Sequence, residues 1–438
     1  MTNQNNNQTL SINQFYSLLF LSFLLIFILT PVKGYEFDTK CWSSWAVQLL
    51  DKGIANSYAV ENLNYNPLFL YVLWIYAKLM GSVPKINENI YHLKQFVLLF
   101  DYLAIVFLAK FLLKRNTNYF YGFYLLFNVA YLYNTIFWGQ LDAIHTTLML
   151  LSFLCLFDKK AIPATVFFVL ALNMKLQAIV FTPLFILLLF PSINYKTLGK
   201  TIVTAIIVQV IIVLPYILHG TVMGVWNNNV NSVGFAPLVS LNAFNVWHIL
   251  LFTQRPMLIS DEVLFIGISL KSWGFIMFFL SSFIVLMPLI LVIVERRVQD
   301  NKFYQLFFLT SALITFTFFY FNTEMHERYI HPAILFCGIY AILASDYIIY
   351  IFLSVIYFLS LEKFIQVLRL NSYTTSLSDP LTFIFERKVI AVLYLAFFIM
   401  GLYKLLKIYG IKRDEYIKLF NPITYFKYFK NNNPEKTA

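Results

Sequence analysis

Three short polar clusters interrupt a strongly apolar chain, and they hold the residue types best suited to chemistry. They are 138–142 (Trp-Gly-Gln-Leu-Asp), 173–177 (Asn-Met-Lys-Leu-Gln) and 324–329 (Glu-Met-His-Glu-Arg-Tyr). Ionisable groups at membrane depth are unfavourable and usually mark a site. Since the loop count given below places all three clusters on one face of a membrane, we expect them to form one catalytic pocket.

A fourth polar stretch on the same face holds Asp38, just after the first apolar run. An aspartate can act as a general base that takes a proton from an acceptor hydroxyl. It is also a favourable N-cap for a helix. The two interpretations are compatible, and both stay open.

Asp142 begins the fourth apolar run, two residues after Gln140. A carboxylate at a helix start is stabilised by the helix dipole, but it can also orient a sugar or an acceptor. His145 lies one turn later on the same helix face. Lys175 and Gln177 occupy a turn between two further runs, where a lysine either snorkels to the surface or binds a phosphate.

The third cluster contains two glutamates, two histidines and one arginine within eight residues, 324–331. A solvated loop explains charge but not this combination. Arginine is preferred for phosphate because its planar fork donates two parallel hydrogen bonds, so we expect Arg328 to be functional. Histidine and carboxylate also bind metals. However, the five-residue spacing of His326 and His331 does not place both rings on one helix face, so a divalent metal is possible but not favoured.

A long polar segment further on carries Asn242, Asn245 and Trp247. Two amides and an indole suit carbohydrate binding by hydrogen bonds and stacking. A re-entrant helix packed on the bundle would explain the same residues, and both alternatives stay open.

The composition defines the protein class that must position these residues. Of 438 residues, 60% are hydrophobic and 12% are charged, and the mean hydropathy is +0.71. These values exclude an ordinary soluble domain, and long apolar runs favour helices over a membrane barrel. We predict an all-α polytopic membrane protein. The net charge of +11 comes from short loops, as the positive-inside rule expects, so we expect no nucleic-acid partner. The three cysteines show no metal or disulfide spacing.

The apolar runs predict twelve spans, including an uncleaved first span. They are 15–30, 95–113, 118–137, 142–157, 161–173, 177–190, 201–219, 272–294, 304–322, 329–344, 346–360 and 389–408.

With the N-terminus in the cytoplasm, the short inner loops carry Lys and Arg, and the polar clusters fall outside. The two long outer loops are 31–94 and 220–271. In the first, Trp42, Trp45 and Leu49 form one stripe of an interfacial helix that Asp38 would cap, and a second interfacial helix runs from Pro67 through Tyr76. We therefore expect a disordered segment 1–14, a single transmembrane domain 15–408 and a basic cytoplasmic tail 409–438.

Several motifs together resemble the polytopic GT-C glycosyltransferases, and among them the mannosyltransferases related to the enzyme that adds the second mannose to GPI anchors, with their prokaryotic relatives. The Met-His-Glu-Arg-Tyr string is the most specific of these motifs. The motifs that carry the resemblance are Gly34-Tyr35-x-Phe37-Asp38 with Trp45-Ala46, Gly139-Gln140-x-Asp142, Lys175-x-Gln177, Ser240-Leu241-Asn242-Ala243-x-Asn245-x-Trp247, and Met325-His326-Glu327-Arg328-Tyr329 followed by Pro332. The group often has Asp-Tyr-Pro-Pro where this chain has Asn64-Tyr65-Asn66-Pro67.

The resemblance implies a bundle of about 11–13 transmembrane helices and inverting transfer of a hexose, with mannose first, from a polyprenyl- or dolichyl-phosphate donor. The acceptor would be a glycan or glycolipid on the non-cytoplasmic face, and no cofactor is implied. Asp38 maps to the catalytic base. Arg328, Lys175 and His326 would hold the donor phosphate. The sugar and acceptor would contact further polar residues: Gln140, Asp142, Gln177, Asn242, Asn245 and Glu327.

Two other functions remain alternatives. A transporter or lipid-linked sugar flippase also fits about twelve spans, but it predicts polar residues at mid-bilayer and two related halves. A relative that lost catalysis and serves as an assembly subunit would explain the fold but not the intact clusters. For the host membrane we expect a bacterial inner membrane, with the endoplasmic reticulum as the alternative.

Overall fold

The computed structural model describes residues 11–30, 34–59, 63–192, 194–251, 255–295, 301–370 and 383–410. Most of the predicted disordered segment and nearly all of the basic tail lie outside these ranges. The predicted boundary of the disordered segment 1–14 needs one correction. Helix α1 (Ile12–Leu29) already includes residues 12–14, because Ser11 and Gln14 form a reciprocal capping box.

Seven helical segments in the described residues are long and apolar enough to cross a membrane. This confirms an all-α, multi-pass membrane protein. Each segment contains most of one predicted span. They are α1, α5 (Leu93–Leu113) with the short helix α4 (Val83–Asn89) before it, α11 (Tyr195–Leu218), α14 (Leu270–Val294), α15 (Asn301–Phe321), α17 (Ile348–Ile365) and α19 (Arg387–Tyr409).

Four other predicted spans are shorter helices, and two of them form the centre of the bundle. Nearly every residue of α8 (Asp142–Phe157) and α16 (His331–Ala344) is buried. The others are α9 (Ala161–Met174) and α10 (Thr182–Leu189), which follows the 3₁₀ turn η5 (Leu176–Phe181). Long helices therefore pack around the short helices α8 and α16, whose first residues lie at the polar clusters, and the long helix α15 is itself mostly buried.

The prediction of one continuous span over 118–137 is wrong. The segment is broken into η3 (Tyr119–Tyr121), α6 (Gly122–Leu126), α7 (Val129–Tyr133) and the π-helical turn η4 (Asn134–Trp138). At Asn128 the backbone becomes extended, and the Asn128 side chain accepts from the Tyr131 N–H at 3.1 Å, which caps a new helix. Its amide also donates to Tyr350 Oη at 2.8 Å. The hydropathy of a continuous apolar run gives no indication of such a break in the helix.

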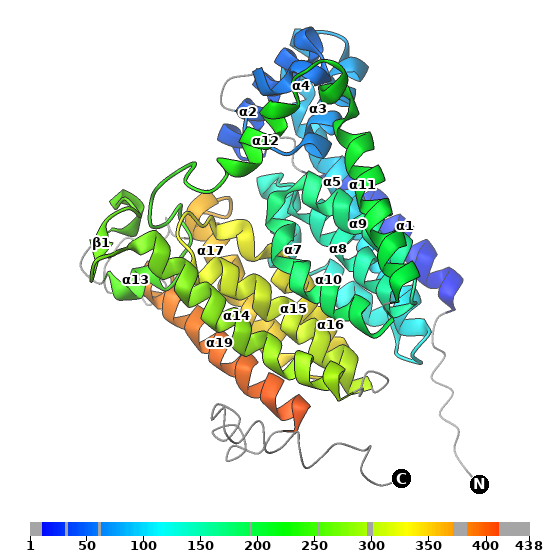
Figure 1. Ribbon diagram of the computed structural model, residues 1–438, viewed down its shortest axis with the longest axis vertical. Coiled ribbons are helices and arrows are strands. Elements are labelled where there is room, and N and C mark those ends of the chain that lie inside the picture. Colours follow the sequence, from blue (N-terminus) through cyan, green and yellow to red (C-terminus); the bar gives the residue numbers. More distant parts are fainter. Residues whose placement is uncertain are drawn as a thin grey trace.

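A separate lobe stands on one end of the bundle (Figure 1). It contains α2 (Glu36–Lys52), α3 (Pro67–Met80), α4, the turns η1 (Ile54–Ala59) and η2 (Ile90–His92), and α12 (Val222–Val230) from the second long loop. The predicted stripe exists, but Trp42 and Trp45 are buried inside the lobe, and the Trp42 ring meets that of Phe69 at 5.7 Å. Asp38 lies in the first turn of α2, and the N-cap is Tyr35. The capping interpretation of Asp38 is therefore wrong.

The rest of the second long loop packs on the bundle beside this lobe. It contains α13 (Trp247–Leu250), the turn η7 (Pro256–Leu258) and a two-stranded antiparallel hairpin of β1 (Leu264–Phe265) and β2 (Ile268–Ser269), in which Leu264 pairs with Ser269. Because α12 has nine residues and α13 has four, the described part of the loop contains no helix of bilayer length.

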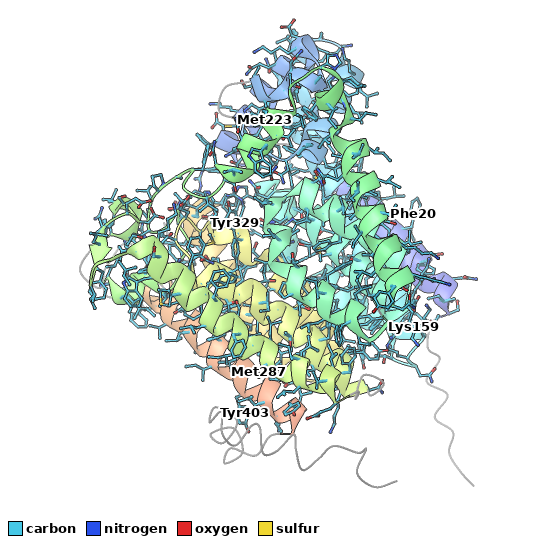
Figure 2. All side chains as sticks on the ribbon, in the orientation of Figure 1. Phe20, Lys159, Met223, Met287, Tyr329 and Tyr403 are labelled. Carbon is cyan, nitrogen blue, oxygen red and sulfur yellow. The ribbon has the colours of Figure 1, made fainter. Side chains whose placement is uncertain are left out.

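The two sets of loops lie at opposite ends of the bundle. Figure 2 shows Tyr329 just below the lobe and Met223 within it, whereas Lys159 and Tyr403 lie at the other end. At that far end Lys114 pairs with Asp158 at 2.7 Å, and Tyr409 bonds to Glu295 at 2.8 Å. The predicted grouping of the polar clusters on one face is confirmed.

Candidate active site

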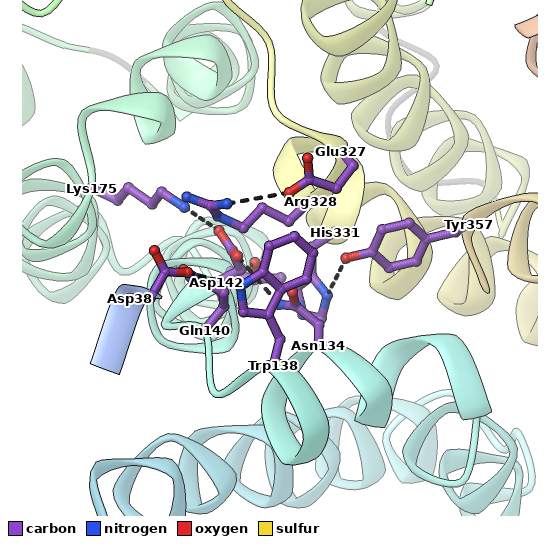
Figure 3. A network of polar contacts seen from close by, with 11 residues as sticks. Asp38, Asn134, Trp138, Gln140, Asp142, Lys175, Glu327, Arg328, His331 and Tyr357 are labelled. Carbon is purple, nitrogen blue, oxygen red and sulfur yellow. Dashed lines mark hydrogen bonds and ion pairs between the residues drawn. The ribbon is translucent and has the colours of Figure 1, made fainter. Parts of the chain in front are cut away.

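Asp38 is held from below by two side chains of the first cluster (Figure 3). The Trp138 indole N–H donates to Asp38 Oδ2 at 2.8 Å, and the Gln140 amide donates to the same oxygen. Both hydrogen bonds reach Oδ2, which leaves Oδ1 of this half-buried carboxylate for another partner. In Figure 3 that second oxygen points toward the side where Lys175 and Arg328 lie.

The backbone around Trp138 explains why these donors point at Asp38. Turn η4 ends at Gly139, whose φ of +87° disfavours any side chain, and whose N–H reaches back to the Asn134 carbonyl at 3.1 Å. The Trp138 carbonyl accepts from the Tyr35 N–H at 2.9 Å. A Cβ on Gly34 would lie 2.8 Å from that carbonyl oxygen, so the close approach requires glycine. The lobe and the bundle are thereby joined next to Asp38.

Asp142 and Lys175 form a buried ion pair at the ends of two short central helices. Asp142 is fully buried at the start of α8, and it accepts from Lys175 and from the Asn134 amide, the latter at 3.2 Å. The Lys175 side chain is 11% exposed. Burial, followed by the charge of Arg328, lowers the pKa of Lys175, and Asp142 opposes that shift. Its ammonium also lies 5.1 Å from the Tyr329 ring centroid.

The third cluster forms the 3₁₀ turn η8 (Glu327–Ile330) between α15 and α16. Glu327 Oε1 accepts from Arg328 at 3.3 Å, whereas Oε2 is buried and accepts no hydrogen bond from the described residues. Burial raises the pKa of Glu327 to about 7, although Arg328 acts in the opposite direction. The Arg328 guanidinium lies 5.2 Å from the Trp138 ring centroid, so it lies next to one of the two side chains that donate to Asp38.

His326 and Glu324 lie beside this turn in different electrostatic roles. Burial, with Arg328 and Lys175 nearby, lowers the pKa of His326 well below its usual value, so the ring is neutral at pH 7. Burial raises the pKa of Glu324, while backbone hydrogen bonds partly compensate. The Glu324 carboxylate accepts from the Gly234 N–H at 2.9 Å and lies 3.4 Å from Lys271.

A cavity of about 790 Å³ lies between the lobe and the bundle, a size typical of small-molecule sites. Lys175, Gln177, His326 and Arg328 line it. The carboxylates of Asp38, Asp142 and Glu327 stand next to these cations but are not part of the wall. Lys175, Lys271 and Arg328 therefore face the space together with one carboxylate, Glu324, while Asp142 and Glu327 hold Lys175 and Arg328 from behind.

The structure brings together most of the predicted site residues. Gln140 holds Asp38, and Gln177 is on the cavity wall. Asn242 and Asn245 do not line the cavity. Asn245 is buried and donates to the Asn322 carbonyl at 3.3 Å, and Asn242 adopts a φ of +71° in a segment that pairs with the backbone at His326. Trp247 donates to the Phe321 carbonyl at 3.1 Å, so these residues fix the loop to α15.

Sequence reasoning missed three features of the site. The Trp138 indole was part of a predicted cluster, but its role as a donor to Asp38 was not predicted. Asn134, which holds Asp142, falls inside an apolar run that gives no signal. The amides of α12 also line the cavity, and their four-residue spacing at Asn227 and Asn231 could have indicated a shared helix face.

No group of three or more His, Cys, Asp or Glu side chains in the described ranges is arranged to hold a metal ion. The sequence matches no protein-family model, and no curated protein has significant similarity to it. The chemistry of the site must therefore be argued from its own geometry.

Proposed function

We propose that the protein is an inverting glycosyltransferase with a GT-C-like membrane bundle. It would transfer a hexose, with mannose as the first candidate, from a polyprenyl- or dolichyl-phosphate donor to a glycan or glycolipid. The reaction would occur on the non-cytoplasmic face of a bacterial inner membrane or, alternatively, of the endoplasmic reticulum.

One observation carries the proposal: Lys175, Arg328 and a neutral imidazole line the cavity, and beside them lies a half-buried carboxylate with one oxygen that accepts no hydrogen bond from the described residues. Lys175 and Arg328 suit a phosphate, and preorganised cations stabilise charge that develops on a leaving group. Asp38 supplies the group that such a transfer needs on the acceptor side, a base next to the same cavity.

The reaction balances with these groups alone. The acceptor hydroxyl oxygen attacks the anomeric carbon and forms the new glycosidic bond, while Asp38 Oδ1 takes the hydroxyl proton. The bond between the anomeric carbon and the phosphate oxygen breaks on the opposite side, and its electron pair leaves with the lipid phosphate. Arg328, Lys175 and neutral His326 stabilise the phosphate. In-line displacement inverts the anomeric configuration.

The surrounding residues act by positioning. Trp138 and Gln140 fix the orientation of the Asp38 carboxylate, and Asp142 fixes the Lys175 ammonium. Preorganisation of this kind avoids reorganising the groups during the reaction. Each positioning residue contacts the group it holds rather than the cavity.

The apolar part of the cavity wall suits a lipid-linked donor. Phe275 of α14 lines the cavity, and Phe279 and Phe283 continue the same face of the helix at four-residue spacing. They are 65% and 50% exposed in a helix long enough to span the membrane, so they face lipid. A prenyl chain could lie along this stripe while its phosphate reaches Lys175 and Arg328.

The test is transfer by the purified protein from synthetic farnesyl- and dolichyl-phosphate hexoses to candidate acceptors, with the product anomer assigned by NMR. We expect an inverted product and no product from Asp38→Asn. A retained configuration, or neither transfer nor donor hydrolysis with any lipid hexose, would contradict the proposal. A cysteine at position 177 labelled alternately from both membrane faces would support a transporter instead.

A further inference from the structure

Five asparagine side chains line the cavity on the side of the lobe. Asn64 and Asn66 come from the segment before α3, Asn227 and Asn228 come from α12, and Asn231 is the C-cap of that helix. The charged and titratable lining residues come from other parts of the chain, at positions 175, 271, 324, 326 and 328. One wall is therefore neutral and polar, and the other carries the charges.

Close packing fixes the position of the asparagine wall. A Cβ on Gly224 would lie 2.7 Å from Tyr58 Cβ, so α12 sits directly on η1. The Asn228 amide donates to Asn66 Oδ1 at 3.3 Å, and the Asn66 amide donates to the Leu172 carbonyl of α9 at 2.8 Å. This chain of contacts connects α12, the segment before α3, and the end of the bundle.

Three of the five amides remain available to a ligand. The side chains of Asn64, Asn227 and Asn231 line the cavity, are exposed, and make no hydrogen bond within the described part of the chain. Asn231 caps α12 four residues after Asn227, and its N–H donates to the Asn227 carbonyl at 2.9 Å, so the two side chains lie near one another at the end of the helix. By contrast, Asn229 on the same helix bonds to its own Val225 carbonyl at 2.9 Å and does not line the cavity.

The chemistry of the amide indicates what this wall would bind. Each amide offers one acceptor and two donors without charge, which matches hydroxyl groups that both donate and accept. A phosphorylated or carboxylated ligand would need a cation here. Of the cations that line the cavity, Lys175 and Arg328 serve the donor phosphate in the proposed reaction, and Lys271 already lies 3.4 Å from Glu324.

We infer that the wall formed by Asn64, Asn227 and Asn231 is a binding subsite for an uncharged, polyhydroxylated sugar. The identification of this sugar as the acceptor rests on the proposed function. The subsite holds the sugar between the lobe and the bundle, on the side of the cavity away from the donor phosphate. The protein therefore selects a neutral glycan terminus over a phosphorylated one.

The probe is octyl mannoside, compared with its 6-phosphate, and binding is measured by saturation-transfer NMR on the full chain in detergent without glucoside. Removing two neutral hydrogen bonds lowers affinity by roughly tenfold. We expect that loss for octyl mannoside in the Asn227→Ala/Asn231→Ala variant, and weaker binding of the phosphate by the wild type. The matched control is Asn229→Ala on the same helix, which should bind as the wild type does.

A second readout separates this inference from the proposed function. In a transfer assay, the double variant should raise the KM for octyl mannoside about tenfold and leave hydrolysis of the lipid-phosphate donor unchanged. If transfer occurs but the variant binds and transfers normally, the inference is wrong and the proposed function stands. If amide-dependent binding occurs without any transfer or hydrolysis, the subsite stands and the glycosyltransferase proposal fails. Preference for the 6-phosphate would overturn the inference.

Discussion

The indole N–H of Trp138 donates to the carboxylate of Asp38 at 2.8 Å across 100 residues of sequence. Trp138 is itself stacked on Phe364, with ring centroids 5.3 Å apart and an angle of 20° between the planes. The carboxylate is thus oriented by an aromatic side chain that the last turn of α17 holds in place. An aspartate fixed in this way can present one oxygen to a substrate in a reproducible direction.

Replacing Asp38 with asparagine should remove the base and preserve the shape of the site. We expect transfer to fall by about 10²-fold or more, as is typical when a general base is lost, with unchanged expression and thermal stability. The matched control is Glu36→Gln in the same turn, because the Glu36 side chain is 80% exposed and pairs with Lys40. Full activity in Asp38→Asn would disprove the role of the base.

Trp138→Phe should keep the stacking on Phe364 and remove only the hydrogen bond to Asp38. We expect kcat to fall about tenfold, as for the loss of one hydrogen bond to a charged group, and the KM for the donor to stay unchanged. Steady-state kinetics separates the two parameters. Trp273→Phe is the control, because that indole donates to the Phe265 carbonyl in the hairpin. An equal decrease of kcat in both variants would indicate a general packing defect.

Lys175→Met should destabilise the protein strongly, because it leaves the buried Asp142 carboxylate without its cation. Breaking a buried pair in this way costs about 3–5 kcal/mol. Adding Asp142→Asn should restore most of the lost thermal stability in detergent without restoring transfer. Lys160→Met is the control, since Lys160 is 64% exposed and lies 3.8 Å from Asp158. If the double variant is as unstable as Lys175→Met, the pair is not the source of the effect.

Ionisation of the buried Glu327 carboxyl should lower the free energy of unfolding as pH rises toward neutrality. Its pKa is about 7 in the folded protein, raised by burial, against 4.5 in an unfolded chain. Between these values the folded state binds more protons than the unfolded state, so stability decreases with rising pH, by at most about 1.4 kcal/mol per pH unit. Melting temperatures from pH 4.5 to 8 should show this slope, and Glu327→Gln should flatten it. The exposed Glu262→Gln should keep the wild-type slope, and an unchanged slope in Glu327→Gln would refute the assignment.

The sequence predicted the long helices well because each is a continuous apolar run of membrane length. It also grouped Asp38, Asp142, Lys175 and Arg328 on one face, because loop polarity alternates along the chain. The break at Asn128 was not predictable in the same way, since the asparagine meets Tyr350, whose position depends on tertiary packing. Hydropathy indicates which residues avoid water, but it does not indicate tertiary hydrogen bonds such as the one between Asn128 and Tyr350.

Local pattern left two interpretations open for residues whose partners are distant. Asp38 follows the rule for a helix cap, but Trp138 and Gln140 determine its role. Asn245 and Trp247 resemble a sugar-binding pair, whereas both bond to backbone carbonyls at the end of α15. In each case a polar side chain next to an aromatic one predicted a site, and only the tertiary structure distinguishes a ligand contact from a contact within the fold.

Because of turn η4, the direction of the Trp138 side chain depends more on the number of residues between 134 and 139 than on their types. Its N–H groups reach back five residues instead of four, so the turn contains one residue more than an α-helical turn would. Deleting a single residue between 134 and 138 would leave an ordinary α-helical turn, which lacks the wider loop that now ends at Gly139. The indole would then face another direction, even if every remaining side chain were kept. Substitutions in this stretch can be absorbed by packing, but a change in the number of residues cannot.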